Sequence, residues 1–273
     1  MKQSQLTPEY INSISYTDFV GLINQWNVLP GAHVSLSKWM VFSELKKESR
    51  LLEVACTTGF SSRELAKMTG CSGIGFDISQ ASVTNAIYNK EKYAPHIQIE
   101  YQVADGYQFE DPNKFTHVVV GAALRFFPDP ERMLQKILSL LQTNGYILAT
   151  EFYVTQEIPK DLIQQAQKTF HITPTSIPYK EVMQIYRGLD VIYEDDNLLR
   201  VETTDELEHY TTSTVDRACE HLNIIDDQVR RAIFNRLLTI KTVSNLLRPY
   251  QRYNTLVLRY DPDIYPRRFV ELF

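Results

Sequence analysis

Residues 51–59, Leu-Leu-Glu-Val-Ala-Cys-Thr-Thr-Gly, constrain the fold of this chain more than any other stretch. An apolar run enters a turn of small residues, and a helical pattern begins near Ser61. A second apolar run ends on Asp77, 18 residues after Gly59. Strand, tight turn, helix, strand and acid in this order predict a βαβ unit that binds a nucleotide. Small residues let the backbone approach a ligand, and the helix N-terminus and the second acid offer polar contacts.

The turn itself indicates which kind of nucleotide is expected. A dinucleotide fingerprint has three glycines that make room for a pyrophosphate. Here only Gly59 is glycine, and Ala55 and Thr57 stand where the others would sit. Glu53, inside the first strand, is a poor neighbour for a pyrophosphate but suits a ligand with an ammonium or sulfonium charge. An NAD-type oxidoreductase is therefore disfavoured.

The same stretch resembles the first motif of class I S-adenosylmethionine (SAM)-dependent methyltransferases, in which an acid precedes a Gly-x-Gly-x-Gly turn. Glu53 takes the place of the acid, Ala55 and Thr57 replace the first two glycines, and Gly59 keeps the third. The β-branched Thr57 would be strained at positive φ. The resemblance implies a Rossmann-like fold, SAM as cofactor and S-adenosylhomocysteine (SAH) as product.

Three later segments resemble further motifs of this family, in the family's order. Residues 102–106 end the third strand and contain Asp105, which resembles the acid that accepts a hydrogen bond from the adenine amine. Residues 115–129 resemble the fourth strand and the loop that flanks the transferred methyl group. Residues 141–149 resemble the entry to the fifth strand. The order and spacing of the motifs make the resemblance stronger than any one of them does.

Alternating strand and helix patterns predict an α/β protein with a parallel sheet and right-handed crossovers. The family resemblance implies the complete form of this fold, a Rossmann-like, seven-stranded, mostly parallel sheet with helices on both faces and a final antiparallel pair of strands. The strands are expected at 51–55, 73–77, 98–103, 116–121, 145–152, 190–195 and 254–260, and the main helices at 61–69, 79–93, 130–142, 204–222 and 226–247. Three parts are expected: an N-terminal helical lid (1–48), a SAM-binding core (49–152), and a C-terminal part (153–273) with a helical cap insertion at about 203–250 and a closing strand at 254–260.

The family resemblance implies a set of cofactor-binding residues. Asp77 is expected to hold the ribose, although Asp also favours helix N-caps. Asp105 could instead hold a turn, Glu53 could pair with a buried cation, and Cys56 is expected to line the cofactor through its backbone rather than react as a thiol. The full expected set is Glu53, Ala55, Cys56, Thr57, Gly59, Asp77, Ile78, Ala104, Asp105, Gly106, Gly121 and Tyr16.

The sequence is less informative about catalysis. Alignment of acceptor and methyl group supplies much of the acceleration, and a base is needed only if the nucleophile arrives protonated. His33 is the candidate catalytic residue, because its loop is expected to fold over the cofactor; the alternative is a histidine at the flank of a helix. Arg125 could bind an anionic substrate group or stand at a helix entrance.

The composition and charge of the chain limit the partners that are expected for it. A net charge of −5 and a pI near 5.7 argue against nucleic acid as the main partner. The three cysteines lack the spacing of a metal site, so no metal is expected. The N-terminus lacks the apolar core of a signal peptide, and no run approaches 18 apolar residues, so a cytoplasmic protein without a membrane partner is expected.

These observations predict a SAM-dependent methyltransferase that acts on an O, N or C atom of a small-molecule acceptor in the biosynthesis of a specialised metabolite. A homodimer is one expected assembly. The alternative is a pseudoenzyme that binds SAM or SAH without catalysis and acts through a protein partner.

Overall fold

The central strand β1 (Arg50–Val54) shows why this sequence forms a sheet covered on both faces. In the computed structural model, which describes residues 6–266, its last four residues are all buried. A strand buried on both faces in this way fits a parallel sheet with helices on each side. Its neighbours are β2 (Ser72–Asp77) and β4 (Phe115–Gly121), both parallel to it.

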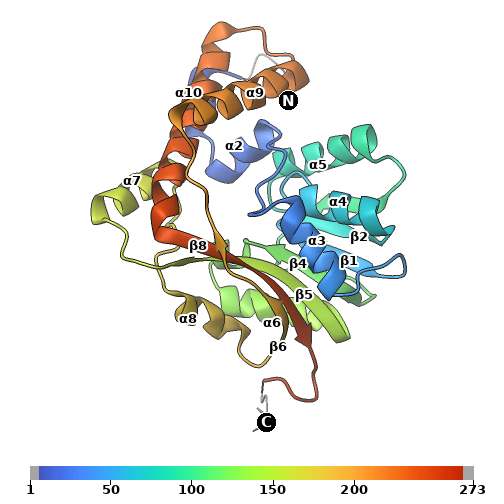
Figure 1. The fold of residues 1–273 in the computed structure, drawn as a ribbon. Helices are drawn as coiled ribbons and strands as arrows, with labels where there is room; N and C mark the ends of the chain where they lie inside the picture. The colour runs from blue at the N-terminus through green and yellow to red at the C-terminus, as the bar shows by residue number, and fades with distance from the viewer. Residues whose placement is uncertain (1–5, 267–273) are drawn as a thin grey trace.

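Within the described residues, eight strands form one sheet with the order β3-β2-β1-β4-β5-β8-β6, and β7 also pairs with β8 (Figure 1). β8 runs antiparallel to both β5 and β6. The expected Rossmann-like, mostly parallel sheet is confirmed. The count differs from seven because of the two-residue β7, which is too short to be seen as an apolar pattern. The remaining strands are β3 (Gln98–Val103), β5 (Leu141–Val154), β6 (Asp190–Glu194), β7 (Asn197–Leu198) and β8 (Gln251–Tyr260).

Helices cover both faces of the sheet, in agreement with the alternation of side chains along each strand. On one face, Leu52 and Val54 pack with apolar residues of α6 (Pro130–Leu140). On the other face, Leu51 packs with residues of α3 (His33–Phe42), α4 (Phe60–Thr69) and α5 (Gln80–Tyr93).

A third apolar cluster joins the N-terminal helices to the helices inserted before β8. Buried Ile11 and Phe19 share this cluster with Phe170, Val215 and Ile233. Figure 1 shows α9 and α10 beside α2, at the end of the molecule away from the C-terminus. The helices that form the cluster are α1 (Pro8–Ser13), α2 (Tyr16–Leu22), α7 (Lys160–Phe170), α9 (Thr204–Leu222) and α10 (Asp227–Leu247). The division into lid, core and C-terminal part stays a prediction, and residues 1–5 of the first part and 267–273 of the last part lie outside the described residues.

One boundary differs clearly from the sequence prediction. The helix expected to end at residue 142 ends at Leu140, and β5 starts at once and continues to Val154. Asn144 has a φ of 60° inside this strand, so the Asn-Gly pair bends the strand entry instead of ending the helix. Residues 145–154 then pair one to one with β8, which explains the length of the strand.

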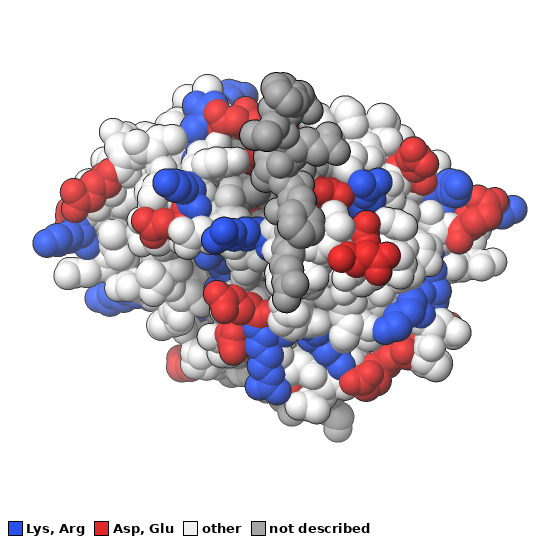
Figure 2. All heavy atoms as spheres, turned by 90° about the horizontal axis from the view of Figure 1, so that it is seen from below, with Lys and Arg blue, Asp and Glu red and all other residues white. Residues whose placement is uncertain are grey.

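The surface gives two further observations. On the face drawn in Figure 2, acidic and basic side chains are interspersed among uncharged ones. Among the helices of the described residues, none is both long and apolar enough to cross a membrane. The expected cytoplasmic location stays a prediction.

Candidate active site

The turn between β1 and α4 forms the centre of the candidate site. Ala55, Thr57 and Gly59 have φ angles of 52°, 48° and 73°, so every second residue is left-handed. Glycine, which has no Cβ, adopts this left-handed region freely, whereas each residue with a side chain is destabilised there by about 1–2 kcal/mol. The turn therefore has the alternating left-handed backbone that suits a Gly-x-Gly-x-Gly sequence, with two of the glycines replaced. Strain of this kind collects at functional sites when the surroundings enforce it.

Asp77 lies at the carboxyl end of β2 and holds this turn. Its Oδ2 accepts a hydrogen bond from the Thr57 backbone N–H at 2.9 Å, and its Oδ1 accepts one from the Ser79 N–H at 2.8 Å. Burial raises the pKa of this carboxyl, and the two backbone hydrogen bonds oppose the rise. Ser79, not Asp77, is the N-cap of α5. An ionised carboxylate has about four acceptor positions, so Asp77 keeps capacity for ligand hydroxyls.

Glu53 is buried under the same turn and is bonded to the start of α4. Its Oε2 accepts hydrogen bonds from the backbone N–H and the hydroxyl of Ser62, at 3.0 and 2.5 Å. Burial raises the pKa of Glu53, and the bonds from Ser62 lower it in part. Glu53 thus supports the first turn of α4, and its contact with a cofactor stays a prediction.

The adenine end of the expected site lies at the ends of β2 and β3. The N–H of Ala104 donates to the carbonyl of Asp77 at 3.1 Å, which aligns the two strand ends. Asp105 is exposed and its Oδ1 accepts from the Tyr107 N–H at 3.0 Å. Ile78, which follows the buried Asp77, is 74% exposed. The buried Gly106 approaches Phe127 so closely that a Cβ there would lie 3.1 Å from the ring.

The other expected residues are placed at different points around the turn. Gly121 ends β4 with a φ of 55°, and a Cβ added to it would meet only Leu29, at 3.7 Å. His33 is exposed at the start of α3, with its ring 5.2 Å from that of Phe60, the first residue of α4. Tyr16 packs its ring edge-on against Phe170 of α7, 5.6 Å between centroids, within the cluster of the cap. The ring contact of Tyr16 thus lies in the apolar cluster that α1, α2, α7, α9 and α10 form.

Cys56 has the environment of a packing residue. It is 3% exposed, and burial, together with the negative charges of Glu53 and Asp77, raises the pKa of its thiol well above the ordinary value. A thiol in this state is a poor nucleophile. Among the described residues, no group of three or more His, Cys, Asp or Glu side chains is placed to hold a metal ion.

A buried polar cluster beside the β4 loop was not predicted from the sequence. Glu151 lies on β5, two residues past the Gly121–Ala149 pair, and is 3% exposed. The Tyr186 hydroxyl donates to its Oε1 at 2.5 Å, and Arg125 Nε donates to its Oε2 at 3.3 Å. Burial raises the pKa of Glu151 to about 7, although both partners lower it. The one hint of this cluster in the sequence is Glu151 itself, the single acid of the β5 segment.

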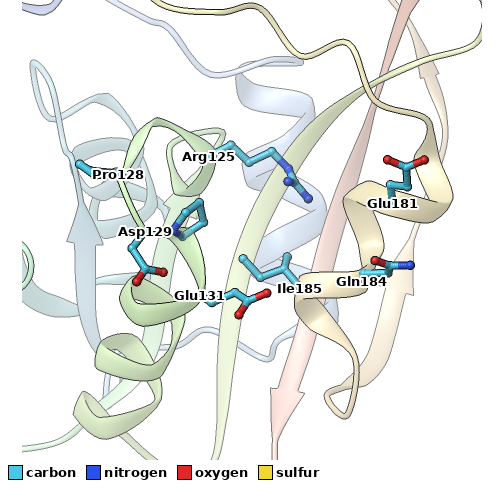
Figure 3. A pocket seen from close by; sticks show the side chains of 8 residues that line it. Arg125, Pro128, Asp129, Glu131, Glu181, Gln184 and Ile185 are labelled. Carbon is cyan, nitrogen blue, oxygen red and sulfur yellow. The ribbon is translucent and has the colours of Figure 1, made fainter.

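A cavity of about 410 Å³ adjoins this cluster through Arg125. In Figure 3, Arg125 approaches the cavity from the segment before α6 and Glu131 from the first turn of α6. Glu181, Gln184 and Ile185 approach it from α8 (Tyr179–Val182) and the turn after it. Arg125 also donates through Nη2 to the carbonyl of Val182, so it joins the two walls. The cavity therefore lies at the β4 loop, and none of its lining residues belongs to the turn at 55–59.

Known proteins share this fold and this sequence pattern. The family model described as "Methyltransferase domain" matches residues 45–201. The crystal structure of MccD protein is 28% identical, with a TM-score of 0.70 over 86% of this chain and 100% of that one. A SAM-dependent methyltransferase from Geobacter sulfurreducens, solved with SAH, is 18% identical, with a TM-score of 0.66 over 88% of this chain and 96% of that one.

Among curated sequences, the malonyl-[acyl-carrier protein] O-methyltransferase of Magnetococcus marinus is 32% identical over 113 residues, which is 41% of each chain. The chain spans from 25% to 65% of the length of the curated relatives that it matches.

The family model covers more than half of the chain, so the chain belongs to the methyltransferase domain family. Its resemblance to the class I SAM-dependent methyltransferases is thereby confirmed, as is the expectation of an enzyme of this class. The individual site residues stay predictions.

Proposed function

We propose that this protein transfers a methyl group from SAM to an O, N or C atom of a small-molecule acceptor. The observation that carries the proposal is the turn with alternating left-handed residues at Ala55, Thr57 and Gly59, fixed against Asp77. SAM supplies an electrophilic methyl carbon on a sulfonium sulfur. The residues of this chain have to bind that ligand, orient it and hold the acceptor in line with it.

The residues at the strand ends fit such a ligand. The turn carries only small side chains, with Ala55 and Thr57 half-buried. Asp77 has free acceptor positions for the two ribose hydroxyls. Exposed Ile78 offers an apolar surface to a base, and exposed Asp105 offers an acceptor to an exocyclic amine. These are the roles that we propose for the three side chains.

On the acceptor side, we assign Glu151 the role of proton acceptor for nucleophiles that arrive protonated. It lies at the carboxyl edge of the sheet, beside the β4 loop, and its pKa of about 7 suits a group that takes a proton near neutral pH. His33 is the second proposed proton acceptor, exposed at the start of α3 with its ring against that of Phe60. The proposed acceptor is a small molecule, and the sterol and phosphoethanolamine methyltransferases among the relatives support this choice.

Two measurements test this function. Calorimetric titration of the full chain with SAM and with SAH is expected to give dissociation constants well below millimolar. Incubation with SAM labelled on its methyl group and a fractionated extract of small metabolites is expected to label one fraction. The proposal would be overturned if neither SAM nor SAH binds. Binding without transfer to any fraction would favour the pseudoenzyme that acts through a protein partner. The homodimer and the role in specialised metabolism stay proposals.

A further inference from the structure

Tyr101 of β3 reaches across β2 to the cofactor turn. The hydroxyl of Tyr101 donates to the carbonyl of Gly59 at 3.1 Å and lies 2.9 Å from the hydroxyl of Ser62. Ser62 in turn donates to Glu53. A residue 42 positions away in sequence therefore closes a buried network under the turn.

Two glycines make this reach possible. A Cβ on Gly75, in β2, would lie 2.8 Å from the Tyr101 ring, and a Cβ on Gly59 would lie 2.6 Å from its hydroxyl end. Neither distance is tolerated in a packed interior. Glycine within a strand marks a close approach of another group, and here that group is the tyrosine ring, which is 8% exposed.

The turn needs such support because of its sequence. The Gly59 N–H donates to the Cys56 carbonyl at 2.7 Å, which closes a four-residue turn with Thr57 in its second position. Turns with positive φ at that position favour Gly, Asn and Asp. Thr57 is β-branched and has a φ of 48°, so the local sequence disfavours the conformation that the structure shows.

We propose that Tyr101 is a positioning residue that holds the glycine-poor turn in its ligand-binding conformation. This inference rests on the proposed SAM-binding function. Its hydroxyl fixes the carbonyl end of the turn at Gly59, while Asp77 fixes the Thr57 N–H on the other side. The two anchors offset the strain that the missing glycines leave.

The proposal predicts that Tyr101 and Thr57 are energetically coupled. We expect Tyr101→Phe to weaken SAH binding by about fivefold to tenfold, the effect of one lost buried hydrogen bond. In a Thr57→Gly background the β-branched residue at positive φ is gone and most of the strain of the turn is relieved, so the same change is expected to weaken binding by less than about twofold. Thr57→Asn is the second variant, because Asn accepts positive φ without the added freedom of glycine.

Calorimetric titration with SAH measures the four proteins of this double-mutant cycle: the unaltered full chain, Tyr101→Phe, Thr57→Gly and the double variant. Tyr153→Phe is the matched control, because it removes a part-buried tyrosine hydroxyl that bonds Asp196 instead of the turn, and SAH affinity is expected to stay unchanged. An equal loss with Tyr101→Phe in both Thr57 backgrounds, or no loss at all, would overturn the positioning role.

Urea unfolding without SAH separates this inference from the proposed function. The loss of stability caused by Tyr101→Phe is expected to be at least twofold smaller in the Thr57→Gly background. If the unaltered chain fails to bind SAH, the proposed function is wrong, and the unfolding cycle still decides whether Tyr101 holds the turn. Equal losses in both backgrounds would show that it does not.

Discussion

Thr57 donates its backbone N–H to Asp77 across the carboxyl ends of β1 and β2, at 2.9 Å. The bond joins the most strained residue of the turn to the acid proposed to bind ribose. Each group thus depends on the other: the turn keeps its left-handed backbone at Thr57, and Asp77 keeps one fixed orientation. A ligand that binds both would meet a site that is already arranged, which lowers the cost of ordering on binding.

The first prediction concerns Asp77. Replacement by Ala removes both the ribose acceptor and the anchor of Thr57, so SAH affinity is expected to fall by about 10- to 100-fold, the range for hydrogen bonds to a charged group. Asp77→Asn keeps one acceptor oxygen and is expected to lose less. Calorimetry measures the affinity, and circular dichroism checks the fold. Unchanged affinity in Asp77→Ala would remove Asp77 from the site.

The second prediction compares two glycines at the ends of α4. Gly59 and Gly70 both have positive φ, 73° and 77°. A Cβ on Gly59 would clash with Tyr101, whereas a Cβ on Gly70 would meet only Lys47 at 3.6 Å. Gly59→Ala is therefore expected to reduce the free energy of unfolding by about 1–3 kcal/mol more than Gly70→Ala, the typical cost of overpacking. Urea unfolding measures both, and equal losses would mean that the Tyr101 ring moves aside freely.

The elements of this fold could be predicted because their signals are local. The expected helix at 204–222 matches α9, which a capping box of Thr203 and Glu206 starts. The strand at 98–103 matches β3, an apolar alternation in an edge strand. The short β7 carries no pattern of its own, because it forms only by pairing with β8.

The site was predictable where a motif fixes the backbone and not where side chains meet across the fold. Asp77 and the turn follow from spacing along one βαβ unit. The bond between Tyr186 and Glu151 joins residues 35 apart, and its partners are set by how the segment after α8 packs on β5. Glu53 illustrates the same limit: its position was expected, but the sequence did not show that its partner is Ser62.

The third prediction concerns the cysteines, all of which fall within the described residues. Cys56, Cys71 and Cys219 are buried, and burial raises the pKa of each thiol. Reaction with a disulfide reagent at pH 8 is therefore expected to be slow in the native protein and complete only in denaturant, because the thiolate is the reactive form. A thiol that reacts within seconds in the native protein would contradict this, and peptide mapping would identify it.

The fourth prediction is a pH dependence of stability caused by Glu151. Its pKa rises from an ordinary 4.5 to about 7 on folding, so between these pH values the native state binds more protons than the unfolded state. The contribution of Glu151 to the free energy of unfolding is therefore fully present below about pH 4.5, and it is lost as the pH rises through about 7. This pKa shift corresponds to a loss of about 3 kcal/mol in the free energy of unfolding at high pH.

Glu151→Gln is the variant that isolates this effect, because it keeps the shape of the side chain and cannot ionise. Other buried acids, Glu53 and Asp77, also have raised pKa values and affect both proteins alike. Urea unfolding at several pH values between 5 and 8 should therefore give a difference in stability, unaltered minus variant, that falls steadily with pH. A difference that stays constant over this range would show that Glu151 is already ionised in the folded protein, and it would remove the proposed proton acceptor from the acceptor side of the site.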